Sequence, residues 1–206
     1  MSFSISTPVT AGFGGTSLTL TGVPAGASIV VLLQTLTATT TAVTDGTAYI
    51  AAGASSSANF QTQWVQNNAA AGTHTITWTS TGTLNYGLAF YVTGGAVLTG
   101  TPACGVSSFV GTGANAVVCP SITTAVAGAL VIGMATSDST SKALTVGTGY
   151  TSIGALAVGD AAEYQVQVGA GLVAPTFTSA GSDDYLTSTI AFAPATVGVP
   201  VYYYSA

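Results

Sequence analysis

Charged side chains are almost absent from this chain. Only 3% of its 206 residues are charged, and the formal net charge is −5. A soluble domain usually carries about 25% charged residues. Strands can instead present Thr, Ser, Asn and Gln to water, so an all-β fold is expected. The charges are one cation, Lys142, and six acids: Asp45, Asp138, Asp160, Glu163, Asp183 and Asp184.

The charge balance and the apolar runs restrict the partners. With one lysine and no arginine, the chain cannot neutralise a row of phosphates, so neither nucleic acid nor an anionic membrane is expected. The longest apolar run, 125–135, is about half as long as a membrane-spanning helix requires. Residues 1–10 hold no positive charge, so no signal peptide is expected.

Strand patterns occur almost everywhere. Residues 73–79 read THTITWT, which predicts a half-buried strand with His74, Ile76 and Trp78 on one face. Continuous apolar runs at 29–33 and 130–132 predict strands buried on both faces. No capped amphipathic stretch indicates a helix, and the polar segment 179–184 predicts a turn.

An internal repeat of about 100 residues divides the chain into two halves. Three pairs of segments carry it: 25–27 with 127–129, 71–72 with 170–171, and 88–90 with 190–192. The period is far longer than a solenoid unit, so it predicts two tandem jelly-roll-like β-sandwich halves. Chance similarity between two strand-rich stretches is the alternative. The expected divisions are a first half at 1–98, a linker at 99–120, a second half at 121–195 and a tail at 196–206.

The two cysteines, Cys104 and Cys119, lie in the expected linker. A disulfide between them would close a loop of about 15 residues and stabilise the fold by about 3 kcal/mol. Two reduced thiols are the alternative. Zinc is not expected, because the spacing is wrong and no histidine accompanies the pair.

Catalytic and cofactor-binding residues are not expected. A serine triad needs a histidine, and the single one, His74, falls on the same strand face as Ile76. Asp183 and Asp184 are adjacent, so their side chains diverge and do not form the facing pair of a glycosidase. Solvated turn residues are the expectation, and a weak calcium site with Asp138 is the alternative. The chain also lacks the lysine and helix of a phosphate loop.

The C-terminal segment 197–206 reads VGVPVYYYSA and lies outside the repeat. Its consecutive tyrosines are Tyr202, Tyr203 and Tyr204. Tyrosine is enriched in protein contact surfaces, so the segment is expected to dock on a neighbouring subunit. Packing back on its own sandwich is the alternative.

Several segments resemble the β-sandwich modules of bacteriophage virion proteins and bacterial surface proteins. In those modules a buried strand is followed by a Gly-Tyr turn, a polar-aromatic strand and a closing strand that ends in small residues. The similar segments are 127–140, 147–154, 162–171 and 186–195. The resemblance implies a capsid decoration or cement protein, or a head or tail fibre component, without a cofactor.

The expected function is therefore that of a non-enzymatic virion protein that forms homo-oligomers and contacts capsid or tail subunits. A carbohydrate- or receptor-binding module, extracellular or at a cell surface, is the alternative. That module would use ring stacking on loops by Tyr49, Tyr86, Tyr150 or Tyr185.

Overall fold

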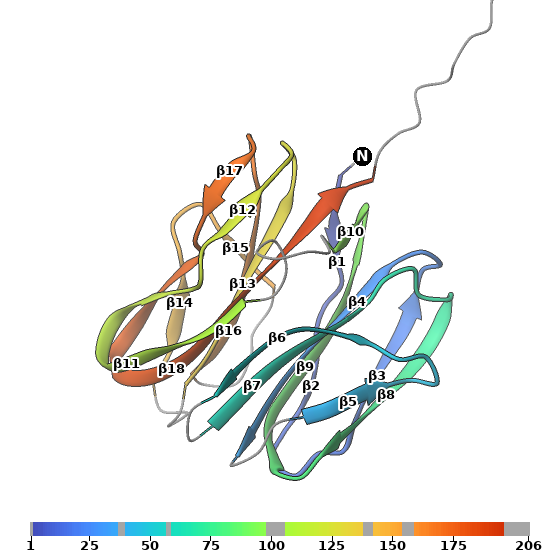
Figure 1. Ribbon diagram of the computed structural model, residues 1–206, viewed down its shortest axis with the longest axis horizontal. Helices are drawn as coiled ribbons and strands as arrows, with labels where there is room; N and C mark the ends of the chain where they lie inside the picture. Colours follow the sequence, from blue (N-terminus) through green and yellow to red (C-terminus); the bar gives the residue numbers. More distant parts are fainter. Residues whose placement is uncertain are drawn as a thin grey trace, which may run out of the picture.

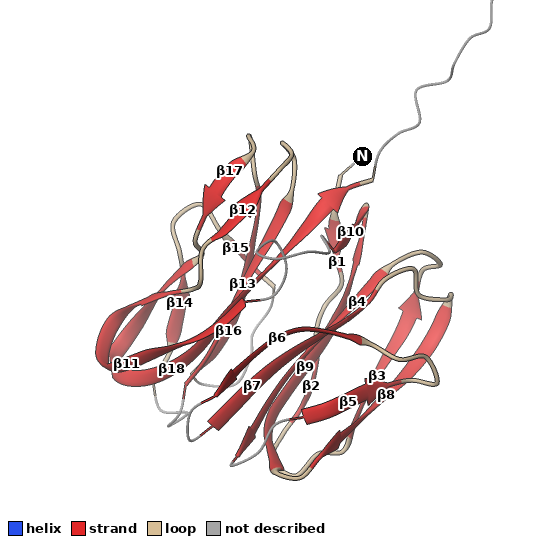
Figure 2. Ribbon diagram, viewed as in Figure 1, coloured by secondary structure: helices blue, strands red, loops and turns tan. Residues whose placement is uncertain are grey.

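A computed structural model describes residues 2–36, 40–56, 59–97, 106–137, 142–153 and 159–195. Every regular element in these ranges is a β-strand, and the described part of the chain contains no helix (Figure 2). The all-β prediction is confirmed. In particular, residues 73–79 lie in a strand in which His74 and Ile76 are buried and the neighbouring threonines are exposed.

The first half of the chain forms two antiparallel sheets (Figure 1). The larger sheet has the order β1-β9-β4-β7-β6, with β2 also pairing with β9. Its strands are β1 (Ser4–Ile5), β2 (Val9–Ala11), β4 (Ser28–Leu36), β6 (Ile50–Ser56), β7 (Asn59–Gln66) and β9 (Thr83–Thr93). The smaller sheet has the order β3-β8-β5, with strands β3 (Ser17–Val23), β5 (Thr40–Thr44) and β8 (Gly72–Ser80).

The second half also has a large and a small sheet. The large sheet has the order β10-β18-β13-β16-β15, and β11 and β14 also pair with β18. Its strands are β10 (Gly95–Val97), β11 (Val106–Val118), β13 (Leu130–Ser137), β14 (Leu144–Val146), β15 (Thr151–Ser152), β16 (Asp160–Val166) and β18 (Thr176–Pro194). The small sheet pairs β12 (Ile122–Thr124) with β17 (Gly171–Val173).

Two segments differ from their sequence predictions. Residues 106–118, inside the expected linker, form β11 and pair along β18. Residues 179–184, expected to be a turn, continue β18. The β11–β18 register shifts between Val110 and Ala114 and again between Ala114 and Ala116. The polar residues therefore lie at irregular positions inside a long strand pair, where a bulge accommodates them without ending the strand.

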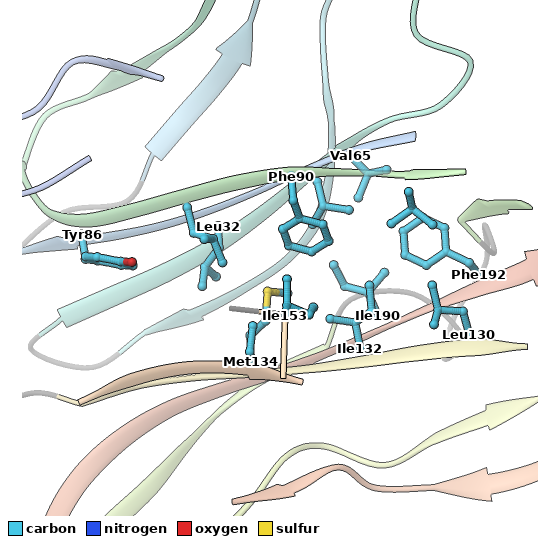
Figure 3. Packing of buried hydrophobic residues seen from close by; sticks show 14 residues of the cluster. Leu32, Val65, Tyr86, Phe90, Leu130, Ile132, Met134, Ile153, Ile190 and Phe192 are labelled. Carbon is cyan, nitrogen blue, oxygen red and sulfur yellow. The ribbon is translucent and has the colours of Figure 1, made fainter. Parts of the chain in front are cut away.

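The two large sheets pack face to face and form the central core (Figure 3). Val30, Leu32 and Phe90 of the first half meet Ile132, Ile190 and Phe192 of the second half. The opposite face of the first large sheet packs on the β3-β8-β5 sheet through Ile29, Val31, Leu33, Leu18 and Ile76, among others. Residues 29–33 are consequently buried on both faces, as their sequence predicts.

The interface between the large sheets becomes polar toward one end. The Gln61 side-chain amide donates to Thr136 Oγ1 at 3.2 Å and to the Leu186 carbonyl at 3.4 Å. The Gln34 amide donates to the Ser137 carbonyl at 3.4 Å. These bonds are buried and link the two halves directly. They therefore select one register between the sheets, which apolar contact alone does not specify.

Candidate functional site

His74 lies in a closed polar cluster. Its Nδ1 bonds to the Asp45 carboxylate, and its Nε2 lies 3.0 Å from the Ala70 carbonyl oxygen. Both partners are acceptors, so the protonated ring, with hydrogen on both nitrogens, satisfies both bonds. Burial lowers the pKa of His74, but the bonds to Asp45 and Ala70 outweigh it and raise the pKa overall. The ring therefore joins β8 to the bend after β5 and has no free nitrogen to act as a general base.

Asp45 is the centre of that cluster. Its carboxylate also accepts the Thr47 N–H at 3.0 Å and the Tyr49 hydroxyl at 3.4 Å. Burial raises the pKa of Asp45, but the bonds from His74 and Thr47 outweigh it, so the pKa lies below its usual value. The Asp45–His74 ion pair therefore has a structural role within the first half.

Glu163 occupies a second buried polar position, in the second half. Its carboxylate accepts the Gly147 N–H at 2.7 Å and the Thr176 N–H at 3.1 Å. Burial raises the pKa of Glu163 to about 7, and these two bonds oppose the rise. The carboxylate satisfies two backbone donors at the edge of the sheet, which is a structural role.

The other described acids were considered for a metal site. Asp183 accepts bonds from the Ser137 hydroxyl and, at 2.9 Å, from the Asp184 N–H. Asp138, the partner considered for calcium, lies outside the described residues. Within the described ranges, no group of three or more His, Cys, Asp or Glu side chains is arranged to hold a metal ion.

Cys119 is buried beneath β18. Its thiol donates a weak bond to the Met134 carbonyl at 3.7 Å, and burial raises the pKa of the thiol well above its usual value. A thiol in this environment is unreactive while it stays buried. Cys104 lies outside the described residues, so the bridge between Cys104 and Cys119 remains a prediction.

Three of the four tyrosines considered as stacking platforms are buried. Tyr49 is 5% exposed, Tyr86 is 7% exposed and Tyr185 is inaccessible. Their rings cannot stack on a ligand from solvent, and only Tyr150 is half-buried. The expectation that they project from loops is wrong for Tyr86 and Tyr185, because these two lie in strands that face other layers of the fold.

Trp78 lines a surface hollow that the sequence did not indicate. The hollow has a volume of about 260 Å³ and lies between the turn before β3 and the end of β8. It is lined by Gly14, Gly15, Thr16, Trp78, Ser80, Gly82 and Thr83. The alternation along β8 correctly placed Trp78 on the buried face, but the tryptophan is near the strand end, where its cover is incomplete.

Exposed apolar side chains gather at one end of the second half. We call this region the β12–β17 tip and define it by Val126, Val166, Val168 and Leu172, which are 41%, 46%, 99% and 74% exposed. The turns that carry them are joined by hydrogen bonds from Gly128 N–H to the Gln167 carbonyl and from Gln167 N–H to the Ala129 carbonyl, both 2.8 Å. The tip lies at one extremity of the molecule, where β12 and β17 end (Figure 1).

The described chain ends beside this tip. A Cβ placed on Gly128 would lie 3.9 Å from Pro194 Cγ, so the end of β18 lies against the Gly128 turn. Tyr202, Tyr203 and Tyr204 lie outside the described residues, and their docking remains a prediction.

The described ranges contain no helix long and apolar enough to cross a membrane. Comparison with family models, curated proteins and solved structures found no match to this chain.

Proposed function

We propose that this chain is a non-enzymatic virion structural protein, a capsid decoration or cement protein or a head or tail fibre component. Its buried polar groups support a non-catalytic role. His74 has both ring nitrogens engaged, and Glu163 uses its carboxylate on two backbone donors. Groups committed in this way hold the fold together and are not presented to a substrate.

The proposal includes two tandem jelly-roll-like halves related by an internal repeat. Equivalent strand pairing supports it, because β4 lies between β9 and β7 as β13 lies between β18 and β16. By the alignment of 25–27 with 127–129, Ile29 corresponds to Val131. Ile29 pairs with Tyr91 of β9 and Gln66 of β7. Val131 pairs with Ala191 of β18 and Gln165 of β16, so the partner strands are equivalent while the register on the last strand differs by two residues.

The glycines that the repeat aligns provide independent support. Gly26 and Gly128 have φ angles of 80° and 76°, and Gly72 and Gly171 have φ angles of 135° and 151°. Such backbone conformations favour glycine over every other residue. Duplicated turns would retain glycine at these positions for that reason.

The β12–β17 tip is the observation that carries the proposed role in assembly. In the first half, the Ala69 N–H bonds to the Ala27 carbonyl in the same way as Gln167 bonds to Ala129. The residues before Ala69 are Asn67 and Asn68, whereas Val166 precedes Gln167 and Val168 follows it. By this equivalence Val166 corresponds to Asn68 and Val168 to Ala70, so the second half exposes two valines where the first half has an amide and an alanine. Grouped exposed apolar side chains are typical of protein contact surfaces.

The described chain ends next to this tip, because Pro194 lies against the Gly128 turn. We infer that the tip and the segment 196–206, with its three tyrosines, together contact a neighbouring virion subunit. This contact surface binds another protein, because a chain with a single lysine has little means of binding an anionic partner.

Two variants test the contact surface. Replacing both Val168 and Leu172 by Asp should weaken self-association and attachment to particles, measured by sedimentation velocity and by co-sedimentation. Phe13→Asp is the matched control, because Phe13 is 72% exposed but belongs to the first half. Deleting residues 197–206 should have the same effect as the double substitution while leaving the thermal unfolding midpoint nearly unchanged.

Location in the particle is tested directly by immunogold electron microscopy. Antibodies against the chain should label intact particles purified from a culture that produces it. Absence of label, together with a protein that stays monomeric at high concentration, would contradict the proposal.

A further inference from the structure

The Trp78 hollow is a feature that the proposed assembly role does not use. It lies in the first half, where β3 begins and β8 ends. Figure 1 shows β3 and β8 at the opposite end of the molecule from β12 and β17. Trp78 packs on the core of the first half with part of its ring and lines the hollow with the rest. The hollow is therefore backed by a rigid aromatic side chain.

A glycine-rich turn borders the hollow. The Gly15 N–H bonds to the Gly12 carbonyl at 3.0 Å, and Gly14 has a φ of 74°. A Cβ placed on Gly12 or Gly14 would meet nothing within 4 Å, so tight packing does not require glycine there. The turn leaves room beside Trp78 and holds Phe13, which is 72% exposed, at its apex.

The lining has one chemical character. It combines the indole of Trp78 with the hydroxyls of Thr16, Ser80 and Thr83 and the backbone of three glycines, and it contains no charged side chain. The Ser80 hydroxyl accepts the Gly82 N–H at 3.1 Å, which orients it at the rim. An aromatic face beside neutral hydroxyls matches a sugar ring, which has an apolar C–H face and a polar edge.

We propose that this hollow binds neutral carbohydrate, with Trp78 as the stacking platform and the threonine hydroxyls as hydrogen-bonding partners. A charged glycan would have no countercharge in the lining. A nucleotide would lack the basic groups that hold its phosphates. The hollow is shallow and small, so it accommodates one or two sugar residues and binds them weakly.

The second half offers an internal comparison, which rests on the proposed repeat. Residues 77–79 align with 176–178 at the same offset as 71–72 with 170–171, so Phe177 corresponds to Trp78. Phe177 is 2% exposed and pairs with Val117 of β11. A phenylalanine is enough to fill the core at this position. The first half instead leaves its aromatic ring partly accessible, as a binding role requires.

The fluorescence of the full-length chain reports on this site, because the protein has two tryptophans and the other, Trp64, is 8% exposed. The probes are neutral oligosaccharides of glucose, galactose, mannose and N-acetylglucosamine, titrated to millimolar concentrations. At least one should give a saturable change in emission. Trp64→Phe should retain that change, and Trp78→Phe should remove it and weaken binding in calorimetry.

A matched pair of threonine variants distinguishes binding in the hollow from binding elsewhere on the surface. Thr16→Val removes a hydroxyl from the hollow and should weaken binding about fivefold, the effect of one hydrogen bond. Thr21→Val removes an exposed hydroxyl from a second hollow, beside Tyr91, and should leave binding unchanged. Binding by no oligosaccharide, or binding that survives both Trp78→Phe and Thr16→Val, would overturn the proposal. Neither outcome affects the assembly experiments, which concern the opposite half.

Discussion

Asp160 should make the protein less stable as pH rises from about 4 to 7. Its side chain lies at the start of β16 and is 7% exposed, and neither carboxylate oxygen has a hydrogen-bond partner in the described part of the chain. Burial raises the pKa of Asp160 from 3.8 to about 7, and the nearby Ser137 backbone N–H, whose geometry falls short of a hydrogen bond to the carboxylate, only partly opposes this rise. An unpaired carboxylate in this position is costly when it is charged.

The size and sign of the effect follow from this pKa. Below pH 3.8 the carboxyl is protonated in both the folded and the unfolded state, so it does not penalise folding. Between pH 3.8 and about 7 the unfolded state ionises first, and the penalty on the folded state grows. Above pH 7 the penalty is constant at about 4 kcal/mol, from about 1.4 kcal/mol per pKa unit.

Asp160→Asn removes the ionisation and keeps the shape of the side chain. The variant should gain a few kcal/mol of unfolding free energy at pH 8 and change little at pH 4. Urea unfolding at pH 4, 6 and 8 measures the difference, with the slope m checked for constancy. Glu163, with a pKa also near 7, should leave the variant with part of the original pH dependence.

Glu163→Gln is the control, because Glu163 has a similar pKa but accepts two backbone N–H groups. At pH 8 the native carboxylate can accept both bonds, whereas an amide would turn its NH₂ group toward one of those donors, so this variant should gain less unfolding free energy at pH 8 than Asp160→Asn. Unchanged stability of Asp160→Asn at pH 8, or a loss there, would show that the Asp160 carboxylate has a partner in solution and would refute the reasoning.

Two further predictions concern the cores and the ion pair. Phe192→Ala should lower the unfolding free energy by about 3–5 kcal/mol, because it opens a cavity where the two large sheets meet. Phe13→Ala, at an exposed position, should change the unfolding free energy by less than about 0.5 kcal/mol. Equal effects of the two variants in denaturant melts would contradict the face-to-face core. Asp45→Asn should destabilise the protein most between the lowered pKa of Asp45 and the raised pKa of His74, because both groups are charged in the native pair only in that window. A histidine titration by NMR that does not shift to lower pH in this variant would rule out the pair.

Alternation along single strands allowed much of the local structure to be predicted. Residues 73–79 alternate, and the structure buries His74 and Ile76 while exposing the threonines. The run 29–33 is continuously apolar, and it lies between two layers. These predictions succeed because the period of a strand and the burial of its faces are read from neighbouring residues.

Long-range pairing produced the failures. Residues 179–184 have the composition of a turn, but pairing with β11 extends β18 through them. The interval 106–118 has many small and polar residues, yet it becomes a strand because β18 offers it an edge. The local composition of these two segments does not show that they pair with each other, so their strand structure could not be predicted from the sequence.

For the candidate surfaces too, local properties could be predicted from the sequence, whereas properties that depend on long-range packing could not. The sequence by itself determined that the chain is all-β and poor in charge, because these properties depend on residue type and local period. Only the tertiary structure decided which aromatic residues reach solvent. Tyr86 and Tyr185 are covered by other strands, whereas Trp78 is left half open beside a glycine turn. Exposure depends on what packs over a residue, and that contact joins segments far apart in the chain.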